Sequence, residues 1–560
     1  MKIALAQQNY HIGNFEQNTQ KIIAAIGEAR LMGADLVVFS ELSVCGYPPR
    51  DFLDFDDFIE KCEAAVEAIA AHTSNIGVLI GAPQRNPNPL GKNLFNAALL
   101  LHHGAVQGRV FKTLLPTYDV FDEYRYFEPA FEWQVLHFKG KKLAVTVCED
   151  IWNLGDNPLY RIAPMDELMK QQPDLMINLS ASPFDYTHDE DRKATIKANV
   201  LKYKLPMFYC NGVGSQTEIV FDGASMVFDA AANLCGQMPM FAESLQCFDL
   251  NDDGSILQPI LEPAHRLPSQ ELAPKTLQPQ LNIGQIHQAL VLGIADYFGK
   301  MGFKKAIVAS SGGIDSAVTL ALAVQALGAQ NVQAVLLPSA FSTAHSVSDA
   351  EQLSQNLQNP YTTLPIAPLF DQFLNTLAPV FGNLPFGIAE ENIQSRIRGN
   401  LVMAIANKFG YILLNTSNKS ELATGYGTLY GDMAGGLAVL GDLYKQQVYA
   451  LANFINHQAP IIPQHIITKP PSAELRPGQK DSDSLPDYDI LDPILYQYIE
   501  RHLGPSDIKA TGADAALVDR ILKMVNVNEY KRNQFCPIIR ISPKAFGVGR
   551  RVPIVAKYLT

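Results

Sequence analysis

The segment "KAIVASSGGIDSAV" (305–318) decides the fold of the second half of the chain. Its first residues, to about 311, are typical of a buried strand, and a helix is expected from about residue 315. The serine- and glycine-rich turn between them exposes backbone N–H groups at a helix start, where the helix dipole favours an anion. The pattern therefore predicts a phosphate-binding loop in a parallel α/β domain.

This loop matches neither of the two commonest phosphate-loop patterns, GxxxxGK[ST] and GxGxxG. Asp315 beside a phosphate would be repelled unless a cation lay between them, so a role as a Mg²⁺ ligand makes physical sense. The alternative is a plain turn in which Asp315 caps the helix. The residues alone leave both interpretations open.

The rest of the second half repeats strand, helix and strand. Strands are predicted at 332–338 and 411–417, with a helix at about 389–409. This order is typical of a doubly wound parallel sheet. The polar, proline-rich segment 469–492 is expected to be a solvated loop, with a mobile lid as the alternative.

The first half reads as a layered α/β domain with a mixed sheet. Helical periodicity appears at about 16–32, 56–71 and 189–203, and apolar strands are predicted at 2–8, 35–41, 76–82, 95–101, 142–148, 174–180 and 206–212. A proline-rich break without apolar periodicity follows. We therefore expect domains at 1–263 and 283–560, joined by a linker at 264–282.

The composition is ordinary for a globular protein, with 47% hydrophobic and 18% charged residues among 560. The formal net charge of -12 gives no general attraction for nucleic acid or anionic membrane. No apolar run approaches the ~18 residues of a membrane span, and the N-terminus lacks a signal-peptide core. Seven cysteines without paired spacing fit the cytoplasm better than a disulfide framework or a zinc site.

Three reactive side chains follow predicted strands in the first half. Glu41 lies in "FSELSVCGYPPRD" (39–51), Lys112 in "VFKTLLPTYDVFDEYRYF" (110–127) and Cys148 in "VTVCEDIW" (145–152). An acid, a cation and a thiol at three strand ends could converge at one sheet edge and form a nucleophilic site. The alternative is that the charged residues face solvent and Cys148 is a core thiol. The acids after Cys148 oppose thiolate formation, so activation would have to come from elsewhere.

These three motifs, in this order, resemble the nitrilase (carbon–nitrogen hydrolase) superfamily over residues 1–260. The resemblance implies an α-β-β-α sandwich in which Glu41 is the general base, Cys148 the nucleophile and Lys112 the stabiliser of the tetrahedral intermediate. Glu123 matches a second acid of that family, and the positions expected to hold glutamine are Tyr118, Glu123, Ser182 and His188. The family usually has Lys or Arg at position 188, so Arg192 is an alternative partner for the glutamine carboxylate.

The second half resembles NAD synthetase through "SGGIDS" (311–316), "ENIQSRIRGN" (391–400), "NTSNKSELATGYGTLYGD" (415–432), "PSAEL" (471–475) and "EYKR" (529–532). The resemblance implies that Asn392, Glu421 and Lys531 face deamido-NAD and that Asp315 and Glu421 hold Mg²⁺. The residues expected to bind ATP are Ala309, Ser310, Ser311, Gly312, Gly313, Ile314, Asp315, Ser316 and Thr416.

Together the two resemblances imply an ATP-dependent amidation of deamido-NAD by ammonia released from glutamine. The expected products are NAD, AMP, pyrophosphate and glutamate, with ATP and Mg²⁺ required and no prosthetic group. We expect a cytoplasmic homo-oligomer acting on small molecules. Two alternatives remain: a GMP-synthetase-like amidotransferase with another acceptor, and a nucleotide-sensing protein with inactive sites.

Overall fold

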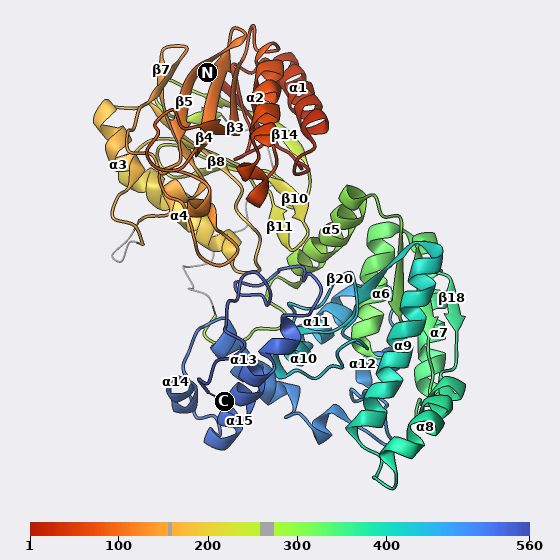
Figure 1. Ribbon diagram of the computed structural model, residues 1–560. Coiled ribbons are helices and arrows are strands. Elements are labelled where there is room, and N and C mark those ends of the chain that lie inside the picture. Colours follow the sequence, from red (N-terminus) through yellow and green to blue (C-terminus); the bar gives the residue numbers. More distant parts are fainter. Residues whose placement is uncertain (155–158, 258–273, 458, 560) are drawn as a thin grey trace. The chain divides into compact units, whose positions relative to one another are not determined.

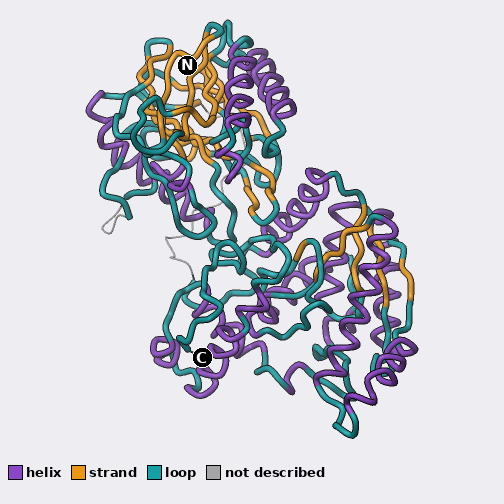
Figure 2. Tube along the Cα trace, in the orientation of Figure 1, coloured by secondary structure: helices purple, strands orange, loops and turns teal. Residues whose placement is uncertain are grey.

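The computed structural model describes residues 1–154, 159–257, 274–457 and 459–559. It divides into two compact units: Met1–Phe184 with His188–Glu271, and Leu272–Thr560 with the short segment Asp185–Thr187. In both units the strands are enclosed by helices (Figure 2). The predicted linker 264–282 lies largely outside the described residues, which resume at 274.

The first unit contains two stacked sheets and a separate hairpin, β10–β11. The larger sheet has the order β15-β14-β1-β2-β3-β4-β5 and the smaller β13-β12-β9-β8-β7-β6. Their strands are β1 Lys2–Gln7, β2 Leu36–Val38, β3 Gly77–Arg85, β4 Leu94–His102, β5 Ala105–Phe111, β6 Leu136–Phe138, β7 Lys141–Val147, β8 Leu175–Ser180, β9 Met207–Asn211, β10 Val213–Gln216, β11 Ile219–Asp222, β12 Met226–Phe228, β13 Leu234–Gln237, β14 Ser244–Leu250 and β15 Ile256–Leu257.

Alternation along the strands explains the layers. On β7, Leu143, Val145 and Val147 join the core between the two sheets, whereas Ala144 packs with helix side chains on the outer face. β1 does the same in the larger sheet, whose outer face is covered by the first two helices (Figure 1). The predicted α-β-β-α sandwich is confirmed. Its helices are α1 Phe15–Leu31, α2 Asp56–Ala70, α3 Pro164–Leu168 and α4 His188–Tyr203.

The second unit is built on a parallel sheet in the order β18-β17-β16-β19-β20. The strands are β16 Lys305–Ala309, β17 Val332–Leu336, β18 Tyr361–Thr363, β19 Tyr411–Asn415 and β20 Leu437–Ala438. Its helices are α5 Ile283–Met301, α6 Ile314–Leu327, α7 Ala344–Leu357, α8 Ala367–Phe381, α9 Ile388–Phe409, α10 Lys419–Thr424, α11 Lys445–Asn456, α12 Gln464–Thr468, α13 Tyr488–Ile499, α14 Pro505–Ala510, α15 Ala515–Val527 and α16 Glu529–Arg532.

The apolar strand at the centre of this sheet is buried on both faces, which explains its continuous run of small and branched side chains. Ile307 packs with side chains of α8 and α9, and the alternating Ala306 and Val308 point to the other face. α6 packs against β16 and β17 and leads the chain away from the strand ends. The doubly wound parallel domain predicted from 305–318 is confirmed.

One expectation for this unit is wrong. The segment 469–492 is not a solvated loop throughout, because residues 469–475 and Asp481 line a cavity in the second unit. Gln479 and Asp481 are buried, and α13 begins at Tyr488 within the predicted loop. The polar composition reflects side chains that face this cavity as well as side chains that face water.

Candidate active sites

The first site lies between the two sheets of the first unit rather than at one sheet edge, as the sequence had suggested. Glu41 follows β2 and Lys112 follows β5 in the larger sheet, whereas Cys148 follows β7 in the smaller one. Because the sheets are stacked face to face, strand ends from both can supply side chains to one buried site. Glu41, Lys112 and Cys148 are each no more than 5% exposed.

Lys112 is the centre of this site. Its Nζ atom donates to Glu41 Oε1 at 2.7 Å and lies 2.8 Å from the Glu123 carboxylate. Asn96, from β4, also donates to Glu41 Oε1 at 2.7 Å, and the backbone N–H of Ala181 donates to Glu41 Oε2 at 3.1 Å. Two acids and a lysine therefore form one buried charged group, with both oxygens of Glu41 already oriented.

Burial and charge act in opposite directions on Lys112 and Glu123. Burial alone would lower the pKa of Lys112, but the carboxylates of Glu123 and Glu41 raise it well above its usual value. Burial, with the charge of Glu41, raises the pKa of Glu123 to about 7 in spite of Lys112. Lys112 is therefore a permanent cation, and Glu123 is the acid that titrates near neutral pH.

Cys148 stands at a strained turn next to this charged group. Its φ of 43° is in the left-handed region, which costs a non-glycine residue free energy and re-aims its side chain. Burial raises the pKa of the thiol well above its usual value, with Glu41 raising it further and Lys112 lowering it. The resting thiol is therefore protonated at neutral pH, so a nearby base must remove its proton before it can attack.

The acid directly after the thiol does not point to solvent. Glu149 is buried, and its carboxylate accepts hydrogen bonds from the hydroxyls of Tyr118 at 3.0 Å and Tyr160 at 3.1 Å. Burial raises the pKa of Glu149, and its charge in turn raises the pKa of Cys148. Glu149 was not among the site residues predicted from the sequence, although its place beside Cys148 was a usable signal.

Asp150 has a structural role at the same turn. Its carboxylate accepts from the backbone N–H groups of Thr113 at 3.0 Å, Leu114 at 2.9 Å and Val147 at 3.0 Å. Burial nevertheless raises the pKa of Asp150 to about 6. Since Thr113 and Leu114 follow Lys112 directly, Asp150 ties the backbone beside Lys112 to the backbone beside Cys148.

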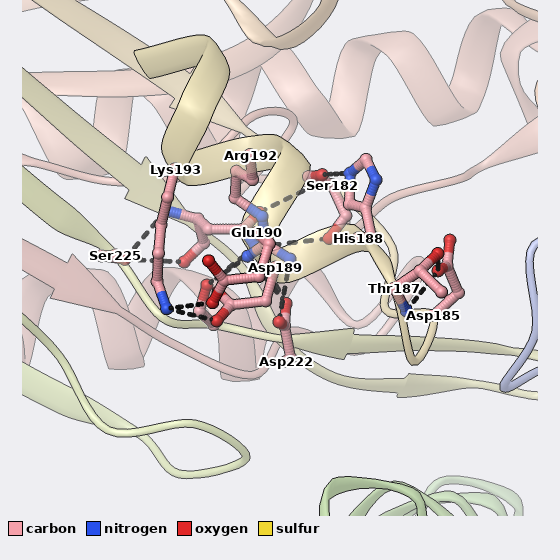
Figure 3. A network of polar contacts seen from close by, with 12 residues as sticks. Ser182, Asp185, Thr187, His188, Asp189, Glu190, Arg192, Lys193, Asp222 and Ser225 are labelled. Carbon is pink, nitrogen blue, oxygen red and sulfur yellow. Dashed lines mark hydrogen bonds and ion pairs between the residues drawn. The ribbon is translucent and has the colours of Figure 1, made fainter. Parts of the chain in front are cut away.

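Two of the residues predicted to hold glutamine lie together, one shortly after β8 and the other at the start of α4. Figure 3 shows Ser182 and His188 facing each other, with Ser182 Oγ 3.0 Å from His188 Nε2. The His188 ring stacks on Trp152, with centroids 5.0 Å apart and planes at 13°. Trp152 follows the Cys148 turn, so this stack places His188 beside the segment that carries Cys148.

Arg192 is not available as the alternative partner for a glutamine carboxylate. It is fully buried and pairs through both terminal nitrogens with Asp222, at 2.9 and 2.8 Å (Figure 3). Such a bidentate buried pair is costly to open. Arg192 therefore joins α4 to β11, and the prediction that it could replace a basic residue at 188 is wrong.

The second site is a cavity of about 300 Å³ in the second unit, at the ends of β16, β17 and β19. Its lining includes Thr416 and, from the predicted phosphate loop, Ala309, Ser310, Ser311, Gly313, Ile314, Asp315 and Ser316. Gly312 has a φ of 75°, and a Cβ atom there would lie 2.1 Å from the carbonyl oxygen of Ser346. Only glycine fits between the loop and α7, so the packing itself requires this part of the motif.

A lysine that the sequence analysis missed lies among the acids of this loop. Lys445 Nζ, at the start of α11, donates to Asp315 Oδ2 at 2.6 Å and to Glu421 Oε1 at 3.3 Å. Asn418 donates to the other Asp315 oxygen at 2.9 Å. No motif in the sequence indicated Lys445, since a buried lysine 130 residues from its partner leaves no local pattern.

Asp315 and Glu421 are two acids that share one lysine, Lys445. Burial and the charge of Asp315 raise the pKa of Glu421 to about 8. A divalent cation would relieve that repulsion, and Mg²⁺ is commonly bound by one or two carboxylates together with substrate phosphates and water. Among the described residues, no group of three or more acidic, histidine or cysteine side chains could hold a metal ion.

Asn392 and Lys531 lie around the loop that follows α10. Lys531 Nζ donates to the carbonyls of Gly425 and Gly427 at 2.7 and 2.8 Å, and Asn392 Oδ1 accepts from the Thr428 hydroxyl at 2.8 Å. Burial lowers the pKa of Lys531. Neither residue lines the cavity around Asp315, although Tyr426, Gly431 and Asp432 of the same loop do.

Comparisons with known proteins agree with both sites. Residues 2–254 match the carbon-nitrogen hydrolase family and residues 286–535 match the NAD synthase family. The chain is 42% identical to the glutamine-dependent NAD(+) synthetase of Synechocystis sp., over 99% of each chain. It is 40% identical to the one from Thermotoga maritima, over 100% of this chain and 99% of that protein.

Solved structures give the same result. A glutamine-dependent NAD+ synthetase from Acinetobacter baumannii, in complex with ADP, aligns with a TM-score of 0.77 and 38% identity. That alignment covers 99% of this chain and 98% of the other. The synthetase from Cytophaga hutchinsonii, at 19% identity and a TM-score of 0.81, supports the fold alone.

The fold and the two sites define a carbon–nitrogen ligase that carries its own carbon–nitrogen hydrolase unit. The full-length similarity is more specific than this class. The chain belongs to the glutamine-dependent NAD(+) synthetase family.

Proposed function

We propose that this protein converts deamido-NAD to NAD, using ATP and ammonia that its first unit releases from glutamine. The observation that carries the proposal is that one chain holds two separate groups of polar side chains with the chemistry that this reaction needs. One is the buried group of Glu41, Lys112 and Glu123 beside Cys148, and the other is the phosphate loop facing Lys445.

In the first unit, Glu41 removes the thiol proton as Cys148 Sγ attacks the amide carbon of glutamine. Lys112 stabilises the negative oxygen of the tetrahedral intermediate, since its charge is held at all relevant pH values. The carbon–nitrogen bond breaks, ammonia leaves with the proton, and a thioester remains on Cys148. Water deprotonated by Glu41 cleaves the thioester and releases glutamate.

Glutamine recognition is assigned to the groups around this thiol. Tyr118 and Glu149 form one polar side, where the Glu149 carboxylate suits the α-ammonium group. Ser182 and His188 form the other, where a hydroxyl and an imidazole suit the α-carboxylate. Glu123 holds Lys112 in place and closes the site beneath the amide.

In the second unit, the loop 309–316 holds the ATP phosphates, with Thr416 in the same cavity. Asp315 and Glu421 would hold Mg²⁺, which when bound neutralises phosphate charge. Lys445 supplies a positive charge at the same point. A carboxylate oxygen of deamido-NAD then attacks the α-phosphorus, and pyrophosphate leaves. Ammonia attacks the resulting acyl-adenylate, and AMP leaves.

The loop 425–432, with Asn392 and Lys531 around it, is the proposed face for deamido-NAD. The species that attacks is neutral ammonia, and water would convert it to ammonium, so ammonia released in the first unit needs a sheltered transfer to the second. The chemistry and the presence of both units in one chain support such a transfer.

A turnover assay tests this function directly. With glutamine, ATP–Mg²⁺ and deamido-NAD, we expect NAD, AMP, pyrophosphate and glutamate in equal amounts. XMP in place of deamido-NAD is the control, because a GMP-synthetase-like enzyme would accept it. Turnover of XMP, or glutaminase activity without NAD formation, would contradict the proposal.

We further propose that the protein works as a cytoplasmic homo-oligomer. Large apolar side chains of α8, α9 and the turn between them are exposed, namely Leu369, Phe373, Val380, Leu384, Phe386 and Ile388. Several exposed apolar side chains on neighbouring segments favour association with a second copy. The cysteines are all free, which suits a reducing compartment. No helix among the described residues could span a membrane. Light scattering on the purified chain tests the oligomer.

A further inference from the structure

Four consecutive residues at the start of α10, Asn418 to Glu421, divide their side chains between two directions. Asn418 and Glu421 face the phosphate loop, through Asp315 at 2.9 Å and Lys445 at 3.3 Å. Lys419 and Ser420 point into the protein and are fully buried. The inward pair has no place in the chemistry described above, so its contacts need a separate explanation.

Ser420 is one half of a link between two helices. Its hydroxyl donates to Asp492 Oδ1 at 2.6 Å, and its oxygen accepts the backbone N–H of Lys445 at 3.0 Å. The second oxygen of Asp492 accepts the backbone N–H of Gln446 at 2.9 Å. Asp492, in α13, therefore holds the first turns of α10 and α11 together, directly beside Glu421 and Lys445.

Lys419 anchors the same turn from the other side. Its Nζ atom contacts Glu500 at 2.7 Å, Asp442 at 2.9 Å and Ser542 Oγ at 2.8 Å. With its charge balanced by two buried acids, Lys419 is not free to meet a phosphate. Its role is to fix where α10 begins.

These anchors matter because α10 is only six residues long. A helix this short does not hold its own shape in water, so tertiary contacts set its position and rotation. The phosphate site needs Glu421, Lys445 and Asp315 in a fixed relation, since errors near 1 Å can remove a large part of a catalytic effect.

We propose that Ser420 and Asp492 form a positioning pair that sets Lys445 and Glu421 against Asp315. The pair touches no substrate and acts through the backbone of Lys445 and the rotation of α10. This inference rests on the proposed ATP-dependent function of the same loop and deepens it.

Ser420→Ala is the main test, and Ser354→Ala is its matched control. Ser354 is a buried serine of α7 in the same unit, and its hydroxyl makes no hydrogen bond. With ammonium as nitrogen source, Ser420→Ala should lower kcat by about tenfold or more, with the KM for deamido-NAD within about twofold of wild type. Ser354→Ala should keep the wild-type kcat.

Hydrogen exchange in the nucleotide-free protein provides a readout that does not depend on turnover. The backbone N–H groups of Lys445 and Gln446 should exchange faster in Ser420→Ala than in wild type. The Lys445 N–H loses its acceptor, the Ser420 hydroxyl, and the Gln446 N–H keeps an acceptor, Asp492, that Ser420 no longer holds in place. The glutaminase rate of the first unit should stay unchanged, and wild-type exchange of the β16 amides should show that the second unit is folded. Wild-type exchange and wild-type kcat in Ser420→Ala would overturn the proposal.

Asp492→Asn is a second test of the proposal, for use if Ser420→Ala folds poorly. The double variant Ser420→Ala/Asp492→Asn should lose no more kcat than the worse single variant, within about twofold, because both changes break the same hydrogen-bonded pair. Additive losses would overturn the proposal. Failure of the wild-type protein to form NAD with ammonium would instead refute the proposed function. The hydrogen-exchange rates of Lys445 and Gln446 would still test whether Ser420 and Asp492 hold this backbone in place.

Discussion

The two sites of this protein place similar sets of charges in different surroundings. In the first unit, Lys112 pairs with Glu41 and Glu123 in a closed, buried group that is assembled before any substrate binds. In the second, Lys445 pairs with Asp315 and Glu421 at the wall of a cavity that leaves room for a ligand. A covalent nucleophile profits from an environment fixed in advance, whereas a site for ATP must leave room for charge that arrives with its substrate.

Cys148→Ala should give the largest effect and the cleanest separation of the two sites. Glutamine-driven NAD synthesis should fall by about 10⁴-fold or more, because no other group can form the thioester. Synthesis from ammonium should stay near wild type, since the second unit is untouched.

Cys247→Ala is the control for this separation, because Cys247 is a partly exposed cysteine of β14 in the same unit. Both activities should survive it. Loss of ammonium-driven synthesis in folded Cys148→Ala would break the comparison, because the sites would not be chemically independent.

Lys445→Met tests the site in the second unit. Removing the positive charge of Lys445 between Asp315 and Glu421 should lower ammonium-driven NAD synthesis by about 10²- to 10³-fold, as expected for a charged group beside a phosphate. Glutaminase activity should remain. Lys523→Met, at an exposed lysine of α15, is the matched control. Equal losses in both activities would show that Lys445 supports the whole chain and not one site.

The pH dependence of the Mg²⁺ requirement sharpens the contrast. The pKa of Glu421 is raised to about 8, so below pH 8 the metal must displace a proton from this carboxyl. The Mg²⁺ concentration for half-maximal ATP binding should therefore rise as pH falls below 8, by up to about tenfold per pH unit. Calorimetry between pH 6.5 and 9 measures this, and a flat profile would contradict it. The first unit should show no Mg²⁺ dependence at any of these pH values.

The smallest effect is expected at His188. His188→Ala should raise the KM for glutamine by about tenfold, the order of one hydrogen bond to a charged group, with kcat much less affected. His137→Ala, at an exposed histidine of β6, should change neither constant. A fall in kcat at constant KM would place His188 in the chemistry instead of in binding.

Much of this organisation could be predicted because its signals are local. The strand and loop at 305–318 and the strand ends at Glu41, Lys112 and Cys148 are contiguous patterns, and the structure has them at the expected places. Their meeting between two sheets could not be predicted, because sheet membership depends on pairing over long distances. The contacts of Lys445, Arg192 and Asp492 were hidden for the same reason. A buried charged residue looks like a surface residue until its partner is known.

The protonated state of Cys148 also determines how the enzyme meets oxidants and alkylating agents. Such reagents attack the thiolate, and this thiol is kept neutral by burial and by three neighbouring acids, Glu41, Glu123 and Glu149. We therefore expect the resting enzyme to react slowly with hydrogen peroxide or iodoacetamide at neutral pH. The burial and the neighbouring acids that keep the thiol protonated would then also protect it from chemical damage.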